Sequence, residues 1–260
     1  MIRFSVLASS SGGNATVVST GTTSVLVDAG VSCRCLCQRL KECGLTPGML
    51  SGLFVTHEHG DHIQGLATFA KKAPLHLYCS RYVAPDLQSQ APGADFTYME
   101  PGSPVQVGDL TVTPFSVSHD VADPFGFLFE SGGVRLGYVT DTGRITRGMP
   151  ELLAGVDALY LESNYDEEML RSSGRPKRLI ARIACPNGHL SNTQACDFVR
   201  SIARPGLRHI TLAHLSQECN TPALAHAAMQ ATLQDLGLHH TQLVCAEPSA
   251  RMPWVEITPA

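Results

Sequence analysis

Two periods of apolar and polar positions run along the chain, and together they predict a mixed α/β protein. Alternating or continuous apolar runs indicate strands, whereas apolar residues spaced three and four positions apart indicate helices. The predicted strands cover residues 2–8, 15–19, 23–28, 51–56, 75–79, 94–99, 109–117, 125–130, 134–139, 156–161, 207–213 and 241–245. The predicted helices cover residues 32–43, 62–72, 144–154, 191–203 and 221–236, and the expected N-caps of the last three are Thr142, Ser191 and Thr221.

The order of these elements predicts a four-layer αββα sandwich. Both halves of the chain are rich in strands, and each half also contains helices. Sheets and helices bury their apolar faces against another layer, so we expect two mixed β-sheets packed face to face and flanked by helices. No low-complexity linker divides the chain, and we therefore interpret residues 1–260 as a single domain.

Composition adds limits on location and partners. The 260 residues are 43% hydrophobic and 16% charged, which is typical of a globular protein with a sizeable core. The apolar start of the chain turns polar by Ser9, too early for a secretory signal, and no apolar run reaches the ~20 residues of a membrane helix. We expect a cytoplasmic protein with no membrane partner. A formal net charge of −4 argues against nucleic-acid binding by bulk charge and leaves room for a local basic groove.

The nine cysteines do not form a recognisable disulfide or zinc pattern. Their number is odd and no CxxC pair occurs, so we expect reduced thiols. Cys33, Cys35 and Cys37 lie in a predicted helix, where Cys33 and Cys37 share one face. That spacing permits metal binding, but packing is the simpler interpretation.

Potential metal ligands stand just after five predicted strands: Asp28, His57, His119, Asp141 and His214. Strand ends are rigid enough to hold side chains to the tolerance that a metal site requires. The same type of residue at the same type of position, repeated five times, indicates one shared site.

The densest group of ligands is the segment VTHEHGDH at residues 55–62. If the chain leaves the strand as a loop, His57 and His59 point the same way and can hold one ion. Asp61 and His62 then face a second ion at the start of the next helix. Two ions ~3.5–4 Å apart form the arrangement that hydrolyses phosphate esters and related bonds. A His-rich surface loop or a lone structural zinc is the alternative, and the further ligands at strand ends argue against it.

This constellation resembles the metallo-β-lactamase superfamily along nearly the whole chain, in HxHxDH at residues 57–62, in Asp28 before it, and in the strand-end residues after it. The resemblance implies two divalent ions, which the sequence leaves open as Zn, Mn or Fe. It places His57, His59 and His119 on the first ion, Asp61, His62 and His214 on the second, and Asp141 between both. It also implies that Asp28 supports the ligands without being one.

Two features separate the branches of this superfamily. Lactamases of this type commonly use a Cys near the role of Asp141, whereas thioesterase and nuclease branches use an Asp. The segment GHLSN adds His189, which is similar to a His that acts near the scissile phosphate in tRNA 3′-processing endonucleases. Ser191 and Asn192, at an expected helix N-terminus, could cradle a phosphate. Glu162 could orient His189 or make an ordinary structural hydrogen bond.

Further segments resemble one bacterial branch, the YycJ/WalJ-type metallo-hydrolases associated with 5′→3′ exonuclease action on DNA. The resemblance runs from about residue 3 to residue 245, and it departs from the usual pattern at Gly60 and Tyr165. The basic segment RSSGRPKRLIAR could supply phosphate contacts through Arg178 and Arg182, or it could be a solvated loop that enters a helix. The loop SSSGGN at residues 9–14 could line the site or merely turn.

We therefore expect a dinuclear phosphodiester hydrolase with DNA as substrate, most simply a 5′→3′ exonuclease. A hydroxide bridging the ions is the expected nucleophile, Asp61 orients it, and His189 protonates the leaving oxygen. The alternatives are a glyoxalase II-like thioesterase, which shares the metal ligands, a small-molecule cyclic phosphodiesterase, and a metal-stabilised binding module without turnover.

Overall fold

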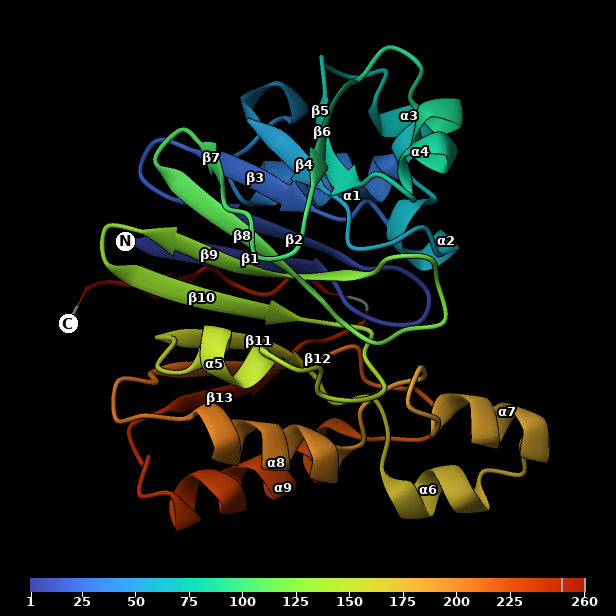
Figure 1. The fold of residues 1–260 in the computed structure, drawn as a ribbon, viewed down its shortest axis with the longest axis vertical. Helices are drawn as coiled ribbons and strands as arrows, with labels where there is room; N and C mark the ends of the chain where they lie inside the picture. Colours follow the sequence, from blue (N-terminus) through green and yellow to red (C-terminus); the bar gives the residue numbers. More distant parts are fainter. Residues whose placement is uncertain (249, 260) are drawn as a thin grey trace.

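The computed structural model describes residues 1–248 and 250–259, and within them the strands form two seven-stranded mixed sheets (Figure 1). The first sheet has the order β14 (Val255–Ile257), β1 (Ile2–Ala8), β2 (Ala15–Ser19), β3 (Ser24–Val27), β4 (Gly52–Phe54), β5 (His76–Ser80) and β6 (Asp95–Met99). The second has the order β13 (Gln242–Cys245), β12 (His209–Ala213), β11 (Ala158–Glu162), β10 (Val134–Val139), β9 (Phe125–Ser131), β8 (Leu110–Ser116) and β7 (Val105–Val107).

Each sheet joins an antiparallel part to a parallel part. Pairing is parallel from β3 to β6 in the first sheet and from β10 to β13 in the second. The parallel strands of a sheet end at the same edge, and ligands usually bind beyond that edge. Both sheets therefore offer an edge at which side chains from distant parts of the chain can meet.

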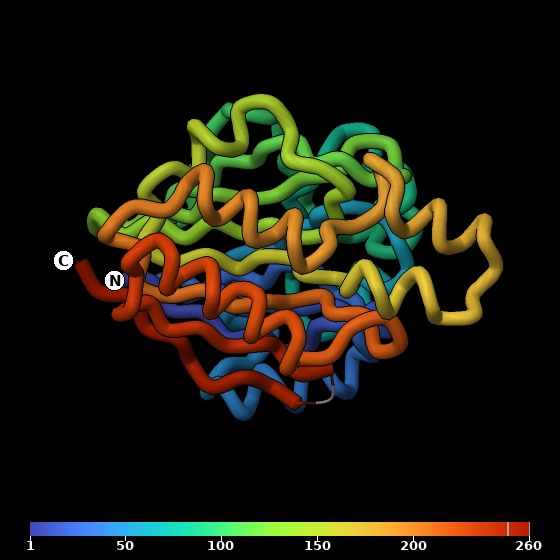
Figure 2. Tube along the Cα trace, turned by 90° about the horizontal axis from the view of Figure 1, so that it is seen from below, coloured from blue at the N-terminus to red at the C-terminus, as the bar shows by residue number. Residues whose placement is uncertain are grey.

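Helices cover the outer face of each sheet, which completes the predicted αββα sandwich. On the first sheet lie α1 (Cys33–Glu42), α2 (Gly60–Ile63), α3 (Leu66–Phe69) and α4 (Ala84–Gln90), with the short 3₁₀ turn η1 (Pro47–Met49). On the second lie α5 (Met149–Leu153), α8 (Asn192–Ile202) and α9 (Pro222–Asp235). The pair α6 (Glu167–Ser172) and α7 (Lys177–Ile183) projects to one side, as the yellow lobe in Figure 2 shows.

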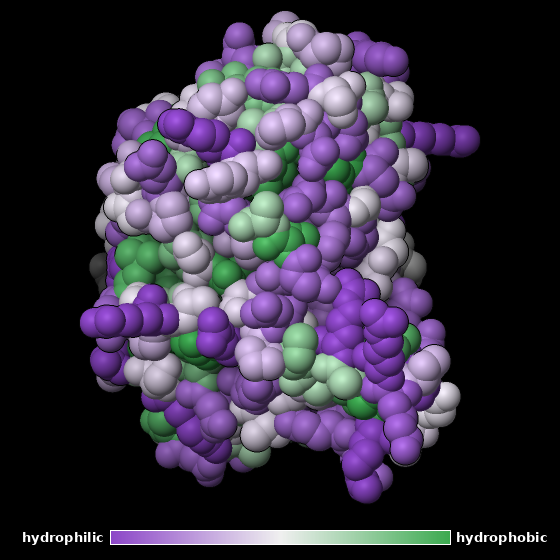
Figure 3. Space-filling model, turned by 45° about the vertical axis from the view of Figure 1, so that its right-hand side comes forward, coloured by the Kyte–Doolittle hydropathy of each residue, from purple (hydrophilic) through white to green (hydrophobic). Residues whose placement is uncertain are grey.

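The core consists of one layer between the sheets and one under each helical layer. Alternation along the strands produces this division, because Val17 packs under the helices while Val18 faces the other sheet. Phe54 of the first sheet stacks on Tyr78 and meets Phe127 of the second sheet edge-on, with ring centroids 5.6 Å apart. On the face drawn in Figure 3, hydrophilic side chains cover most of the surface.

The predicted strands are all present, and the structure adds two short edge strands, β7 and β14. It also adds the helices α4, α6 and α7, which the apolar spacing did not indicate. None of the described helices is both long enough and apolar enough to cross a membrane. The interpretation of residues 1–260 as one domain stays a prediction.

Two helix predictions need correction. The helix expected over 62–72 is divided into α2 and α3, because the Gly65 N–H donates to Ala29 O at 2.8 Å and so leaves the helical ladder. The helix expected over 144–154 is only α5, and its N-cap is Gly148, with φ 91°, not Thr142. The Thr142 hydroxyl instead donates to Arg144 O. Ser191 and Thr221 cap α8 and α9 as predicted.

Candidate metal centre

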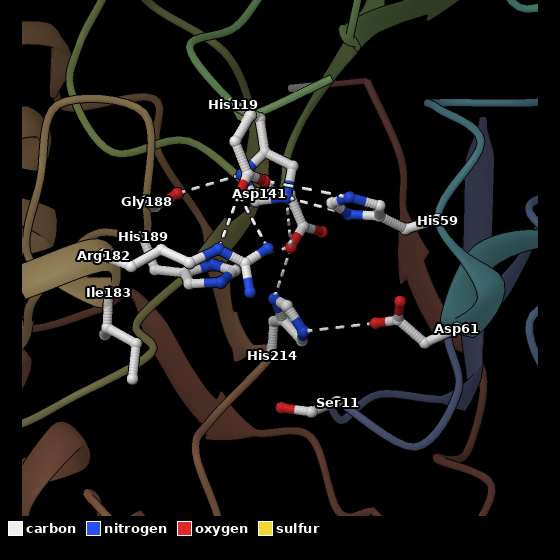
Figure 4. A pocket seen from close by; sticks show the side chains of 11 residues that line it. Ser11, His59, Asp61, His119, Asp141, Arg182, Ile183, Gly188, His189 and His214 are labelled. Atoms are coloured by element: carbon white, nitrogen blue, oxygen red, sulfur yellow. Dashed lines mark hydrogen bonds and ion pairs between the residues drawn. The ribbon is translucent and has the colours of Figure 1, made fainter. Parts of the chain in front are cut away.

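The candidate site is a pocket of ≈ 170 Å³ at the meeting edges of the two sheets (Figure 4). Its lining consists of Ser11, His59, Asp61, His119, Asp120, Asp141, Arg182, Ile183, Gly188, His189 and His214. Seven of these are residues that the sequence predicts for the site. His57 and His62 lie behind the lining, buried to 1% and 0% exposure. Residues more than 150 positions apart in the chain thus meet at one place.

Three imidazoles form the first group in the pocket. His59 Nδ1 lies 3.2 Å from His57 Nε2 and 3.2 Å from His119 Nε2. His119 Nδ1 lies 3.1 Å from the carbonyl oxygen of Gly188, which can only accept a hydrogen bond, so Nδ1 carries the proton and Nε2 presents its lone pair. Ligand nitrogens ~2.0–2.1 Å from a tetrahedral zinc lie ~3.3 Å from one another, close to the spacing seen in this group.

The second group combines imidazoles with carboxylates. Asp141 Oδ2 lies 3.1 Å from His62 Nε2, and its Oδ1 lies 2.9 Å from His214 Nδ1. Asp61 faces the same space from α2 (Figure 4), with Oδ2 3.5 Å from His62 Nε2 and 3.8 Å from His214 Nε2. Asp141 Oδ1 also lies 4.0 Å from His119 Nε2, so this carboxylate stands between the two groups.

Asp28 supports the second group from behind. Its Oδ2 lies 2.8 Å from His62 Nδ1, and its Oδ1 and Oδ2 accept hydrogen bonds from the backbone N–H and the hydroxyl of Thr56, each at 2.8 Å. Asp28 is fully buried. A carboxylate that fixes the Nδ1 proton of a His leaves Nε2 free for a metal, which is the usual support of a metal-binding His.

Three residues of this centre adopt a left-handed backbone. Asp28, Asp141 and His214 have φ values of 60°, 47° and 53°, and within the described part of the chain no other non-glycine residue has a positive φ. Such a conformation costs about 1–3 kcal/mol at a non-glycine residue and is found mainly at functional sites. The backbone is therefore strained at three strand ends, all of them beside the cluster.

The pKa values of the histidines are shifted in opposite directions in the two groups. Burial lowers the pKa of His57 well below its usual value, and burial also lowers the pKa of His119. Burial alone would lower the pKa of His214 too, but the carboxylates of Asp141 and Glu162 raise it to about 10. For His62, burial is likewise outweighed by Asp141 and Asp28, and its pKa is raised well above the usual value.

The acidic members of the centre respond in the opposite sense. Burial would raise the pKa of Asp141, but His214 and His62 outweigh it and hold the pKa well below the usual value. Burial would also raise the pKa of Asp61, and His62 again lowers it. Both carboxylates are therefore ionised at neutral pH, as metal ligands must be.

The donor set fits divalent metal ions. Ligand atoms within 4.8 Å of one another form three overlapping groups: His57, His59 and His119; His57, His62 and Asp141; and Asp141, Glu162, His189 and His214. His214 Nε2 is buried without a hydrogen-bond partner, which is costly unless a ligand is bound there. Imidazole and carboxylate donors suit zinc, manganese and iron. The buried His and Asp clusters are consistent with a dinuclear site.

His189 enters the pocket beside the clusters. Its Nδ1 lies 2.7 Å from Glu162 Oε1 and 3.5 Å from Asp141 Oδ1. Glu162 is fully buried and also accepts hydrogen bonds at Oε2 from the backbone N–H of Thr142 and Leu190. The predicted contact between Glu162 and His189 is therefore present, and the same Oε1 lies 3.1 Å from His214 Nδ1.

The structure separates the four residues predicted to bind substrate. Arg182 lines the pocket, whereas Arg178 is exposed on α7 outside the lining. Ser191 and Asn192 are buried to 1% and 4% exposure, and their side chains are occupied elsewhere. The Ser191 hydroxyl accepts the Gln194 N–H in a capping box. Asn192 bonds to Ser163 and Asn220, so neither side chain faces the pocket.

The rest of the basic segment is largely neutralised. Arg171 pairs with Glu168 and Arg175 pairs with Glu218 on the projecting lobe. Of the two departures from the family pattern, Gly60 stands between the pocket-lining residues His59 and Asp61 and has open space around it, whereas Tyr165 is buried in a small cluster with Leu170 and Cys219.

The sequence alone did not indicate two residues of the site. Asp120 faces the pocket, with Oδ1 3.5 Å from His119 Nε2 and Oδ2 2.7 Å from Arg182 Nε. Its position directly after His119 was the available signal. Asn14 is buried behind Asp61 and His62, at the end of the SSSGGN loop. Ser11 of the same loop lines the pocket, so this loop does contribute to the site.

The sequence matches the family described as "Beta-lactamase superfamily domain" over residues 23–215, a stretch that contains the centre from Asp28 to His214. The chain belongs to the metallo-β-lactamase superfamily. It is a metallo-hydrolase related to the exodeoxyribonucleases YycJ and WalJ. "Exodeoxyribonuclease YycJ" of Bacillus anthracis is 35% identical over 239 residues, which cover 91% of this chain and 90% of the relative. "Exodeoxyribonuclease WalJ" of Streptococcus pneumoniae serotype 2 is 32% identical over 243 residues, with 91% and 90% covered.

Solved structures share the fold. The metallo-β-lactamase fold protein YhfI from Bacillus subtilis has a TM-score of 0.74 at 15% identity, with 98% of this chain and 100% of that chain covered. Zn²⁺-bound PqqB from Methylobacterium extorquens has a TM-score of 0.74 at 19% identity, with the same coverage. The short form of human tRNase Z has a TM-score of 0.67 at 17% identity, covering 98% and 99%.

Proposed function

We propose that this protein is a dinuclear metal-dependent phosphodiester hydrolase that acts as a 5′→3′ DNA exonuclease. The observation that carries the proposal is the His189–Glu162 pair, held at 2.7 Å beside the metal centre. Cleavage of a phosphodiester bond needs a proton for the leaving sugar oxygen, and a positioned His is the usual donor. The two curated relatives named exodeoxyribonucleases support the choice of DNA.

The ligand assignment divides the cluster between two ions. His57, His59 and His119 would hold the first, Asp61, His62 and His214 would hold the second, and Asp141 lies between the two groups. Bound divalent ions at such a site activate water and polarise the phosphoryl group. The identity of the ions, Zn, Mn or Fe, follows from the metal supply as much as from these donors.

The protein groups around the ions supply orientation and proton transfer. Glu162 accepts the Nδ1 proton of His189, so Nε2 is the nitrogen left to deliver a proton into the pocket. The Asp61 carboxylate is partly open to the pocket, where it would accept a hydrogen bond from the attacking water. In this proposal Asp61 of α2 orients the attacking water, and His189, before α8, protonates the leaving oxygen.

Arg182 is the proposed contact for a phosphate beside the scissile one. Its guanidinium lies at the pocket, with Nε and one terminal nitrogen each 2.7 Å from Asp120 Oδ2. Asp120 holds the guanidinium near the metal centre until an anionic substrate arrives. Arg178 lies on the same helix, α7, and is the proposed contact for the next phosphate along the DNA strand. The thioester group itself is neutral, whereas every phosphodiester along a DNA strand carries a negative charge, so these cations favour the phosphodiester.

The test is incubation of metal-reconstituted protein with end-labelled single- and double-stranded DNA and RNA, followed by separation of the products. Stepwise loss of nucleotides from the 5′ end of DNA is the expected result. A thioester and a cyclic nucleotide serve as competing substrates. Hydrolysis of either of these without cleavage of DNA would overturn the proposal, as would tight DNA binding without turnover.

Variants separate the roles within the proposed site. His189→Gln should reduce turnover by about 10²–10⁴-fold while metal content stays at two ions per chain. Asp61→Ala should abolish hydrolysis and release the second ion. Loss of metal from the His189 variant would instead make His189 a ligand, in agreement with its place in the third cluster.

A further inference from the structure

Asn14, which does not line the pocket, lies directly against the second ion-binding group. Its side chain is 1% exposed, in the loop between β1 and β2. Nδ2 lies 3.2 Å from Asp61 Oδ2 and 3.1 Å from His62 Nε2. Both of these atoms belong to the proposed site of the second ion. Asn14 therefore contacts two proposed ligands of that ion, Asp61 and His62, from outside the pocket.

Backbone contacts fix the orientation of the Asn14 amide. Oδ1 accepts the Ser10 N–H at 3.2 Å, while Nδ2 donates to Ser10 O at 3.0 Å. Exchanging the two ends of the amide would set oxygen against oxygen and N–H against N–H. One hydrogen of Nδ2 is therefore committed to Ser10, and the other points towards Asp61 and His62.

The backbone also fixes Asn14 relative to Asp61. The Asn14 N–H donates to Asp61 O at 2.7 Å, and Asn14 O accepts the Gly30 N–H at 2.8 Å. A Cβ on Gly30 would come within 1.6 Å of Asp61 O, so only glycine permits this approach. These backbone contacts join three loops and place the Asn14 amide next to the Asp61 carboxylate.

The chemistry of His62 leaves Asp61 as the acceptor. His62 Nδ1 lies 2.8 Å from Asp28 Oδ2 and carries the shared proton, so an ion binds through the Nε2 lone pair. Once that lone pair is used, Nε2 cannot accept from Asn14. A carboxylate oxygen has a second lone pair, and Asp61 Oδ2 can therefore accept from Asn14 while it faces the ion.

We propose that Asn14 is a positioning residue that holds Asp61 in the orientation that binds the second ion. The inference rests on the proposed two-ion function and names a residue of the same centre. Hydrogen bonds to ligating carboxylates orient them, and loss of such a partner typically costs 10–100-fold in metal affinity. Within the part of the chain that the structure describes, Asn14 makes no hydrogen bond to His57, His59 or His119, which would hold the first ion.

The experiment titrates metal-free protein with Zn²⁺ or Mn²⁺ alone, in competition with a chromophoric chelator, and counts the ions bound at each affinity. Asn14→Ala should lose about 10–100-fold in affinity for one ion and leave the other unchanged. Asn14→Asp keeps the shape and an acceptor for the Ser10 N–H, but it sets a second carboxylate against Asp61. It should also change the affinity of that one ion.

Asn220→Ala is the matched control. Asn220 is a similarly buried asparagine, with 4% exposure, whose Nδ2 donates to Ser163 O and Asn164 O and touches no proposed ligand. It should lower the melting temperature without changing either ion's affinity. Excess Mn²⁺ should restore the activity of Asn14→Ala and have no such effect on the control.

Two outcomes would overturn the inference. One is that Asn14→Asp binds both ions with wild-type affinity. This variant also tests the inference if Asn14→Ala fails to fold. Another is equal loss of both ions in each Asn14 variant. Failure of the proposed function has a different result, because a wild-type protein that binds two ions but cleaves no DNA would leave the role of Asn14 intact.

Discussion

The two ion-binding groups of the centre differ in the protonation of their histidines when no ion is bound. The first contains only imidazoles, and burial keeps the pKa of His57 and His119 low, so their lone pairs are available at neutral pH. In the second, carboxylates raise the pKa of His62 and His214, which therefore carry protons. An ion would bind the first group without displacing these protons, whereas it would have to displace protons from the second.

The backbone shows the same contrast. Asp141 and His214 of the second group have positive φ values, as does Asp28 behind it, while His57, His59 and His119 do not. Strained backbone persists only where the surrounding structure fixes it. The second group is therefore held by neighbouring packing and by buried partners such as Asp28 and Glu162. The first group needs only one short loop, which carries His57 and His59, and one strand end, which is followed by His119.

The largest effect should come from Asp141→Ala, because this carboxylate contacts both groups. Loss of several kcal/mol of charge stabilisation should lower turnover by at least about 10³-fold and reduce the bound metal below two ions per chain. His119→Ala should remove only the first ion. Elemental analysis with rate measurement checks both variants, and an active Asp141→Ala with two ions would refute the shared role.

Of the two ion-binding groups, Glu162→Gln should affect only the second. Its Oε1 contacts His214 and His189, so losing the negative charge weakens the orientation of both. We expect about a 10–100-fold loss of affinity for the second ion, with the first unchanged. Chelator competition measures this. Glu130→Gln, at a partly exposed ion pair with Arg135, is the control and should have no effect on either ion.

Proton release should distinguish the two groups without any mutation. The raised pKa values of His62 and His214 mean that both are protonated at neutral pH, so binding of the second ion releases protons. Its affinity should fall about tenfold per pH unit for each proton released as the pH is lowered. The first ion should show a weaker dependence between pH 6 and 8. Calorimetry in buffers of different ionisation enthalpy counts the protons, and equal release at both steps would break the comparison.

The smallest effect should come from Ser191→Ala, which lies outside both groups. Loss of the capping-box acceptor should lower the free energy of unfolding by about 1 kcal/mol. Metal content and turnover should stay at wild-type values. Thermal unfolding and a rate assay check this, and a drop in turnover with unchanged stability would return Ser191 to the substrate-binding set.

Local pattern explains which parts of the fold were predictable. The buried strands carry strong apolar runs, and the caps Ser191 and Thr221 are local signals, so these features follow from short stretches of sequence. The division of the helix at Gly65 depends on Ala29 O, a contact with a distant loop. The projecting helices α6 and α7 bury few apolar residues, and their pattern was too weak to indicate them.

The sequence by itself determined the family, the αββα architecture and the residue types that gather around the pocket, because strand-end His and Asp residues follow directly from local pattern and motif. Tertiary structure decided which of the other polar residues belong to the site. Ser191 and Asn192 have polar side chains that could bind a phosphate, but these side chains cap α8 and form buried hydrogen bonds instead. Asp120 and Asn14 meet their partners only because distant loops pack together, and no spacing along the chain encodes that packing.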